Sequence, residues 1–231
     1  MQTPSEIPGT GFKFLLYSAS PRRKQLLIET GSDVDVLPNN TNENYPDHLG
    51  GPEIALYLAQ KKGDSFTVHP DKNHISITAD TIVCLDDHVL GKPADRIDAI
   101  RILEKLSGRS HQVFTGVCMK NKEKNICFFS ESIVTFLPLS SALIQRYIDQ
   151  YKPYDKAGSY GAQECLPVEM NPLSDQEKEF LIRIGKPELF QKLLNILPEN
   201  HLPLIREIKG SYFNVMGLPI VELYENLQHF R

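Results

Sequence analysis

Several well-known sequence patterns are missing from this chain of 231 residues, and each absence disfavours a class of protein. There is no G-x-x-x-x-G-K-[ST] and no strand-linked G-x-G-x-x-G, which disfavours Walker-type and Rossmann-type nucleotide binding. There is no H-x-x-x-H or H-E-x-x-H pair to suggest a zinc hydrolase, and no G-x-S-x-G turn to suggest a serine hydrolase. No internal repeat or low-complexity segment is present either.

Long apolar runs and a strong net charge are also lacking. No run approaches the roughly 18 apolar residues that a membrane span needs. Residues 1–11 contain no basic segment typical of a signal peptide, so we expect a flexible tail there and a cytoplasmic protein. The net charge of −4 provides no general attraction for nucleic acid or anionic membrane. Any anion site must therefore be a local cluster of Lys and Arg.

Cysteine is scarce, with four residues and no C-x-x-C spacing. Three of the four lie in strand-like apolar runs, so we expect buried free thiols rather than a zinc site or a disulfide framework. The cysteines are Cys84, Cys118, Cys127 and Cys165.

Strand-like runs alternate with helical patterns, which predicts an α/β fold. Two long runs separated by a short polar turn predict a hairpin, so the sheet should be mixed. The predicted strands are 13–17, 34–37, 75–85, 89–90, 110–119, 126–137 and 204–209. Predicted helices follow Ser20, Gly51, Asp95, Ser140 and Leu218, and small-residue loops are expected at 154–163 and 210–217.

Residues 166–203 differ from the rest of the chain because they show two amphipathic helical patterns in succession. A capping box from Ser174 to Glu177 predicts one helix, and Lys186-Pro187 predicts the start of a second that reaches about residue 197. We interpret this segment as a helical insertion into a single domain spanning residues 1–231.

The most informative stretch is the β-branched, apolar run Ile77–Leu85, which is interrupted by Asp80. An ionised aspartate in a buried strand is costly unless it is paired, hydrogen-bonded or bound to a metal. Asp80 is therefore a candidate functional residue. The alternative is that Asp80 lies at a strand end and caps a turn.

A second candidate is the polar turn between the first strand and the first helix, with Ser20, Arg22 and Arg23. Free backbone N–H groups at a helix start, together with two arginines, suit a phosphate group. The alternative is a solvated basic first turn. Lys92 lies on a rigid turn and Lys62 near a helix end, where either residue alone would be an ordinary surface lysine.

Together these groups predict phosphate chemistry. Carboxylates such as Glu43 and Asp80 can hold Mg²⁺ or Mn²⁺ or take a proton from water, while the cations offset charge on phosphate oxygens. Gln163 has both a donor and an acceptor with which to read a base edge. Sequence spacing leaves open whether these groups converge.

Six blocks that include most of these candidate residues resemble the sequence of the Maf family. The similar blocks occur in that family's order and are specific as an ordered set: Ser18–Arg23, Ala79–Val83, Gly91–Pro93, Leu106–Gly116, Asp155–Gln163 and Gly210–Pro219. The resemblance implies a nucleoside triphosphate pyrophosphatase that uses a divalent cation, Mg²⁺ or Mn²⁺. It also implies a mixed, twisted sheet with flanking helices and two lobes around a central cleft, as in Maf and ITPase-like folds.

The resemblance also assigns residue roles. It makes Asp80 the catalytic general base and gives Glu43 a role with metal or water, so that these two acids are the implied metal ligands. The residues that it places along the phosphate channel are Ser20, Arg22, Arg23, Lys62 and Lys92. Arg22, Thr81 and Gln163 match the selectivity positions of the branch acting on dTTP and UTP, with modified pyrimidine nucleotides as a further substrate class.

The inserted segment 166–203 is the departure from the family pattern, because most relatives have a short glycine-rich connection there. An alternative function is therefore a non-catalytic, nucleotide-binding regulator of cell division or septum formation that acts through the inserted helices. Nucleic-acid binding through Arg22, Arg23 and Lys24 is poorly supported by the acidic net charge. The expected partner is a nucleoside triphosphate substrate, and we expect no binding to nucleic acid or membrane. Whether the protein forms a homodimer is left open.

Overall fold

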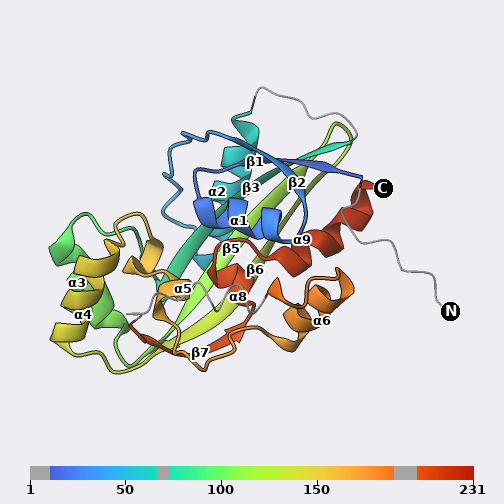
Figure 1. Cartoon of the computed structure of the whole chain (residues 1–231). Helices are drawn as coiled ribbons and strands as arrows, with labels where there is room; N and C mark the ends of the chain where they lie inside the picture. The colour runs from blue at the N-terminus through green and yellow to red at the C-terminus, as the bar shows by residue number, and fades with distance from the viewer. Residues whose placement is uncertain (1–10, 67–72, 190–201) are drawn as a thin grey trace.

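The computed structural model describes residues 11–66, 73–189 and 202–231, which form an α/β fold around a mixed seven-stranded sheet (Figure 1). The strand order is β2-β1-β3-β5-β6-β7, with β4 paired to β3. The strands are β1 (Lys13–Tyr17), β2 (Asp33–Leu37), β3 (His74–Leu85), β4 (His88–Leu90), β5 (Ser110–Lys120), β6 (Asn125–Phe136) and β7 (Ile205–Gly210). This confirms the predicted fold class, and the predicted hairpin is β5–β6.

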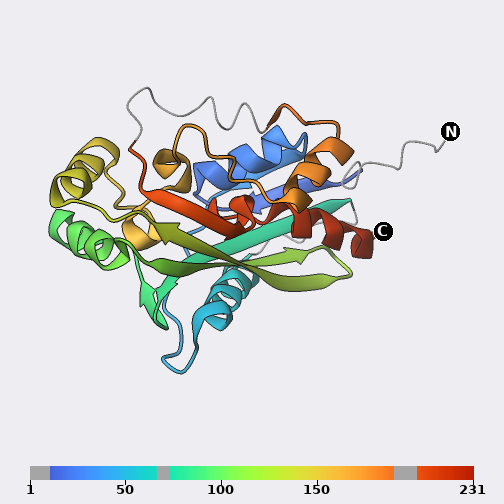
Figure 2. The same ribbon diagram turned by 90° about the horizontal axis from the view of Figure 1, so that it is seen from below.

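Helices cover both faces of the sheet. The α-helices are α1 (Pro21–Glu29), α2 (Gly51–Asp64), α3 (Arg96–Leu106), α4 (Ser141–Tyr151), α5 (Ala162–Cys165), α6 (Asp175–Arg183), α8 (Tyr212–Val215) and α9 (Ile220–Asn226). The described part of the chain also has the 3₁₀ turns η1 (Ala157–Ser159) and η2 (Leu227–Phe230). Figure 2 shows α2 on one face of the sheet and α1 and α6 on the other. None of the helices within the described ranges is long and apolar enough to cross a membrane.

Local sequence signals explain where several helices begin. The Asp95 side chain accepts a hydrogen bond from the Asp98 N–H at the start of α3, and the predicted capping box of Ser174 and Glu177 opens α6. Ser20 precedes α1, but its side chain makes no capping hydrogen bond. The Ser20 hydroxyl is therefore not used by the helix that it introduces.

The order of the first three strands determines where a ligand can bind. β1 pairs in parallel with β2 on one side and with β3 on the other, so the connections through α1 and α2 run in opposite directions. A place where successive connections leave one strand in opposite directions is called a topological switch point, and it leaves a crevice at the carboxyl ends of the strands. β1 pairs only with His74–Ile77, so the remainder of β3 continues past the end of β1.

α2 packs unusually close to the sheet at Gly116 of β5. A Cβ atom at this position would meet the Ala55 carbonyl of α2. Gly116 lies directly opposite Asp80 in the β3–β5 register. The missing side chain therefore lets α2 approach the strand that carries Asp80.

The expectation that all four cysteines are free thiols was wrong for two of them. Cys118 and Cys127 form a disulfide, because they lie directly opposite each other on the antiparallel strands β5 and β6. Their Cα atoms are 4.2 Å apart. Cys84 and Cys165 are free and buried, as expected.

Other differences concern the two predicted loops. Segment 210–217 contains the short helix α8, and segment 154–163 contains η1 and the start of α5. The expected second helix of the inserted segment falls mainly on residues 190–201, and most of the expected tail on residues 1–10. Both ranges are outside the described residues.

We predict that Gly116→Ala lowers the free energy of unfolding by about 1–3 kcal/mol, because the added methyl group forces α2 away from β5. Urea unfolding measures the effect. Gly91→Ala is the control, since an added Cβ at Gly91 meets nothing within 4 Å. Equal stability of the Gly116→Ala variant and the wild type would show that the contact does not limit packing.

Candidate active site

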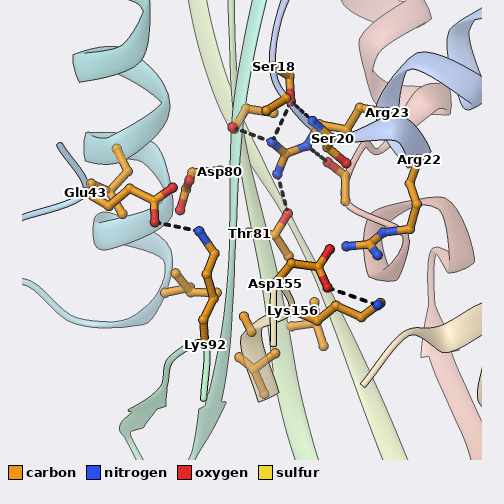
Figure 3. Close-up of a pocket in the computed structure, with 18 of the residues that line it drawn as sticks. Ser18, Ser20, Arg22, Arg23, Glu43, Asp80, Thr81, Lys92, Asp155 and Lys156 are labelled. Carbon is orange, nitrogen blue, oxygen red and sulfur yellow. Dashed lines mark hydrogen bonds and ion pairs between the residues drawn. The ribbon is translucent and has the colours of Figure 1, made fainter. Parts of the chain in front are cut away.

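A cavity of about 510 Å³ opens at the carboxyl end of β1, beside β3. It is lined by the loops after β1 and β2, by the middle of β3, and by residues 215–217 at the end of α8. Figure 3 shows charged side chains converging on it from both sides of β3. The lining includes eight predicted site residues: Ser20, Arg22, Arg23, Glu43, Lys62, Asp80, Thr81 and Lys92.

Asp80 lies in the middle of β3 and is only 7% exposed, so the alternative of a turn-capping aspartate is wrong. Its carboxylate accepts a hydrogen bond from the ammonium of Lys62, which α2 supplies and which is itself 8% exposed. The interpretation of Lys62 as a surface lysine is therefore also wrong. Each charge makes the burial of the other tolerable.

Glu43 connects this buried pair to Lys92. Its two carboxylate oxygens accept from Lys62 at 3.0 Å and from Lys92 at 2.7 Å. Burial acts to raise the pKa of Glu43, but the hydrogen bonds and charges of the two lysines outweigh it and lower the pKa to about 2. Glu43 is therefore ionised at neutral pH. Two acids and two lysines from four different segments of the chain thus form one network.

Arg23 lies in the pocket wall, but its guanidinium is occupied by protein groups. It donates to the carbonyl of Gly217 at 2.7 Å, to that of Ala79 at 2.9 Å and to the Thr81 hydroxyl at 2.9 Å. A further contact reaches the Ser18 hydroxyl at 3.3 Å. The Ala79 carbonyl lies where β3 has passed the end of β1, so Arg23 satisfies a strand edge that has no neighbouring strand.

The side chains of the adjacent β3 residues Asp80 and Thr81 lie on opposite faces of the sheet. The Asp80 side chain meets Lys62 of α2, whereas the Thr81 hydroxyl meets Arg23 and lies 2.9 Å from the Thr115 hydroxyl. Because side chains alternate along a strand, the pocket reaches around the free edge of β3 and includes both.

Asp155 and Lys156 also line the pocket, although sequence reasoning assigned them no role. Lys156 is buried, and its ammonium lies 3.1 Å from Asp155 and 3.6 Å from Glu164. The Arg22 side chain extends toward Asp155 (Figure 3). The sequence signal was present, because both residues belong to the block Asp155–Gln163, but a lysine following an acid in a loop gives no sign of burial.

Gln163 is the only predicted site residue that is not among the lining residues of this pocket. It lies on the short helix α5, three residues after Tyr160, which does line the pocket. The Gln163 side-chain oxygen is buried and has no hydrogen-bond partner within the described part of the chain.

The metal-binding capacity of the site rests on two carboxylates. Among residues 11–66, 73–189 and 202–231, no group of three or more His, Cys, Asp or Glu side chains is arranged to hold a metal ion. Asp80 and Glu43 are bridged by the Lys62 ammonium. This donor set fits Mg²⁺, which proteins commonly bind through one or two carboxylates together with water and substrate phosphates.

The fold and the pocket define a class. A switch-point pocket in an α/β sheet, with arginines at a helix start and lysines paired to carboxylates, is a site for a phosphorylated ligand. A model of the family described as Maf-like protein matches residues 13–171. The chain belongs to this Maf family.

Proteins named dTTP/UTP pyrophosphatase are similar over almost their whole length. The relative from Parabacteroides distasonis is 39% identical over 95% of this chain and 96% of its own length. The relative from Phocaeicola vulgatus is 42% identical, covering 94% and 95%. That from Flavobacterium psychrophilum is 36% identical, covering 92% and 91%.

We predict that Lys92→Met raises the pKa of Glu43 toward its ordinary value of 4.5, because one of its two ammonium partners is lost. A depressed carboxyl pKa stabilises the fold above the unfolded value, and this stability is lost as the pH falls toward about 2. The variant should therefore lose less stability on acidification across this window. Carboxyl NMR titration and urea unfolding measure both effects.

Lys61→Met is the matched control, because Lys61 donates to the Asn44 carbonyl rather than to Glu43. An unchanged Glu43 titration in Lys92→Met would contradict the network described above.

Proposed function

We propose that this protein is a nucleoside triphosphate pyrophosphatase that hydrolyses dTTP and UTP to the monophosphate and pyrophosphate. The observation that carries the proposal is its similarity, at 36–42% identity over almost the whole chain, to relatives named dTTP/UTP pyrophosphatase. The pocket supports it, because acids and cations are the groups that anhydride hydrolysis requires. Modified pyrimidine nucleotides are a further substrate class.

In this proposal Asp80 is the general base. A water molecule attacks a phosphorus atom of the α–β anhydride and passes its proton to the Asp80 carboxylate. The α–β anhydride P–O bond breaks, its electron pair stays on the bridging oxygen, and the products are the nucleoside monophosphate and pyrophosphate. Lys62 holds the carboxylate in position through the buried hydrogen bond between them.

Cations on both sides of the pocket would bind the phosphate chain. Arg22 at the start of α1, Lys92 after β4 and Lys156 in the loop before α5 each line the cavity. The Ser20 hydroxyl, which does not cap α1, is a further donor. A divalent cation held by Asp80, Glu43 and the phosphates would polarise the phosphate oxygens. The choice between Mg²⁺ and Mn²⁺ is part of the proposal to be tested.

The base would be read on the opposite face of β3 from Asp80. Arg22, Thr81 and Gln163 are the proposed selectivity residues. In the described structure Gln163 has a buried acceptor oxygen without a partner, and a buried group of this kind gains from a new hydrogen-bond donor. A pyrimidine N–H group is such a donor.

We further propose that residues 1–231 form one domain with two lobes around the pocket, and that residues 166–203 are an insertion in it. The proposed location is the cytoplasm. The proposed assembly is a homodimer, which sedimentation analysis would test.

We predict that Asp80→Asn lowers kcat by about 100-fold or more with a small change in KM, because a general base acts in the transition state. Pyrophosphate release from dTTP and UTP, with Mg²⁺ or Mn²⁺, measures it. Asp175→Asn, at an aspartate whose side chain is 94% exposed on α6, is the matched control. Full activity of folded Asp80→Asn would contradict the mechanism, and a wild type that binds but does not cleave nucleotides would favour a regulatory role.

We also predict that Gln163→Ala changes base preference more than catalysis. The ratio of kcat/KM for dTTP to that for dCTP should fall by about tenfold, because a lost hydrogen bond to the base removes discrimination. Gln228→Ala, near the C-terminus, is the control at an exposed glutamine. An equal loss on every nucleotide would make Gln163 a structural residue.

A further inference from the structure

Glu177 of α6 is a carboxylate buried to 1% exposure, although it belongs to the helical segment beyond residue 171, where the family match ends. Its carboxylate accepts five hydrogen bonds from the chain. The donors are all uncharged: the backbone N–H groups of Ser174, Tyr212 and Phe213 and the hydroxyls of Ser174 and Ser211. Charge-assisted bonds of this number can offset the cost of burying the charge.

The two oxygens of Glu177 have different partners, and this difference separates two roles. Oε2 accepts from the Ser174 N–H at 2.8 Å and its hydroxyl at 3.0 Å, as in an ordinary capping box, and from Tyr212 at 3.2 Å. Oε1 accepts only from the other side, from the Ser211 hydroxyl at 2.7 Å and the Phe213 N–H at 2.9 Å. Capping α6 therefore uses one oxygen, and the other serves the start of α8.

The start of α8 is one helical turn away from the pocket. α8 spans Tyr212–Val215, and the next residues, Met216 and Gly217, line the cavity together with Val215. The Gly217 carbonyl accepts from Arg23 at 2.7 Å, and the same guanidinium donates to Thr81. A displacement of the α8 start would thus reach the pocket wall through a rigid turn.

The rest of α8 is fixed to the sheet by Asn214. Its side-chain amide donates to the Val113 carbonyl and the Ser132 hydroxyl, and its backbone carbonyl accepts from Thr115. These bonds hold the middle of the helix, whereas Glu177 accepts from the consecutive N–H groups of Tyr212 and Phe213 at its start. In Figure 1, α6 and α8 lie on the same side of the sheet.

We propose that Glu177 is a positioning residue for nucleotide binding: it sets the place of the pocket wall formed by Val215–Gly217. Helix α6 would then complete the site from behind rather than serve only as a partner surface. The effect on KM rests on the proposed function. Asp80 and Lys62 meet on the opposite face of β3, so Glu177 should affect binding more than the chemical step.

The test compares Glu177→Gln with the wild type. The amide keeps the size of the side chain but has one acceptor oxygen in place of two, so bonds to α8 or to Ser174 are lost. The chain has four methionines, so methyl-labelled methionine gives few signals, and Met216 lines the pocket. We expect the Met216 methyl signal to shift or broaden without nucleotide, and the Met119 signal in the core strand β5 to stay in place.

In the same variant, KM for dTTP should rise about fivefold or more, with kcat changed by less than about twofold. Assays are run well below the unfolding temperature of each variant. A purely structural role would lower the fraction of folded enzyme, and so the apparent kcat, and leave KM unchanged.

Ser174→Ala is the matched control, because it removes the hydroxyl of the α6 capping box and leaves the bonds from Glu177 to α8. It should lower the unfolding temperature without moving Met216 or KM. Ser211→Ala removes two bonds at the start of α8, the donation to Glu177 and the cap in which the hydroxyl accepts from the Asn214 N–H. It should move the Met216 signal even if Glu177→Gln fails to fold.

An unmoved Met216 signal in folded Glu177→Gln, or in Ser211→Ala if the former does not fold, would overturn the proposal. Equal shifts of Met216 and KM in Ser174→Ala would overturn it as well. A wild type that fails to cleave dTTP would refute the proposed function instead, because the Met216 measurement needs no turnover and still decides the role of Glu177.

Discussion

The hydrogen bond between Asp80 and Lys62 is the interaction on which the architecture of the pocket depends. Both groups are buried, and either charge alone would be costly at the seam between β3 and α2. The pair can form only because α2 lies close to the sheet, and Gly116 provides the space for that approach. Glu43 and Lys92 extend the pair to the pocket rim, so the charges of the site and the packing of α2 are linked.

The second constraint is that β3 runs past the end of β1. An uncovered strand edge has unpaired backbone groups, and here Arg23 bonds the Ala79 carbonyl in place of a strand. The same edge presents Asp80 toward α2 and Thr81 toward Arg23 of α1. Proposed catalysis and proposed base selection are therefore separated by the two faces of one strand. The wall facing Thr81 is held by Arg23 and, in our proposal, through α8 by Glu177 of α6.

The sequence predicted the strands and the helix starts because these depend on local signals, namely β-branched runs and capping residues. Local signals and the resemblance to the Maf family together pointed to eight of the residues that line the pocket. The sequence did not predict the Cys118–Cys127 disulfide, which depends on the register of two strands. It placed Arg23 beside the phosphates, and it did not predict the bonds of Arg23 to protein groups, one of them 194 residues away. The proposed role of Glu177 also depends on long-range contacts. The capping box alone accounts for a glutamate at this position of the sequence, so its contacts to Ser211–Phe213 were not predicted.

The most direct test of the central claim is a crystal structure of the wild-type protein with Mg²⁺ and α,β-methylene dTTP, which cannot be cleaved between its first two phosphates. The account predicts the phosphate chain between Arg22 and Lys92, the methylene bridge beside Asp80, and the thymine on the Thr81 side of β3. A nucleotide bound outside this pocket, or phosphates held without contact to the Asp80–Lys62–Glu43 network, would contradict it.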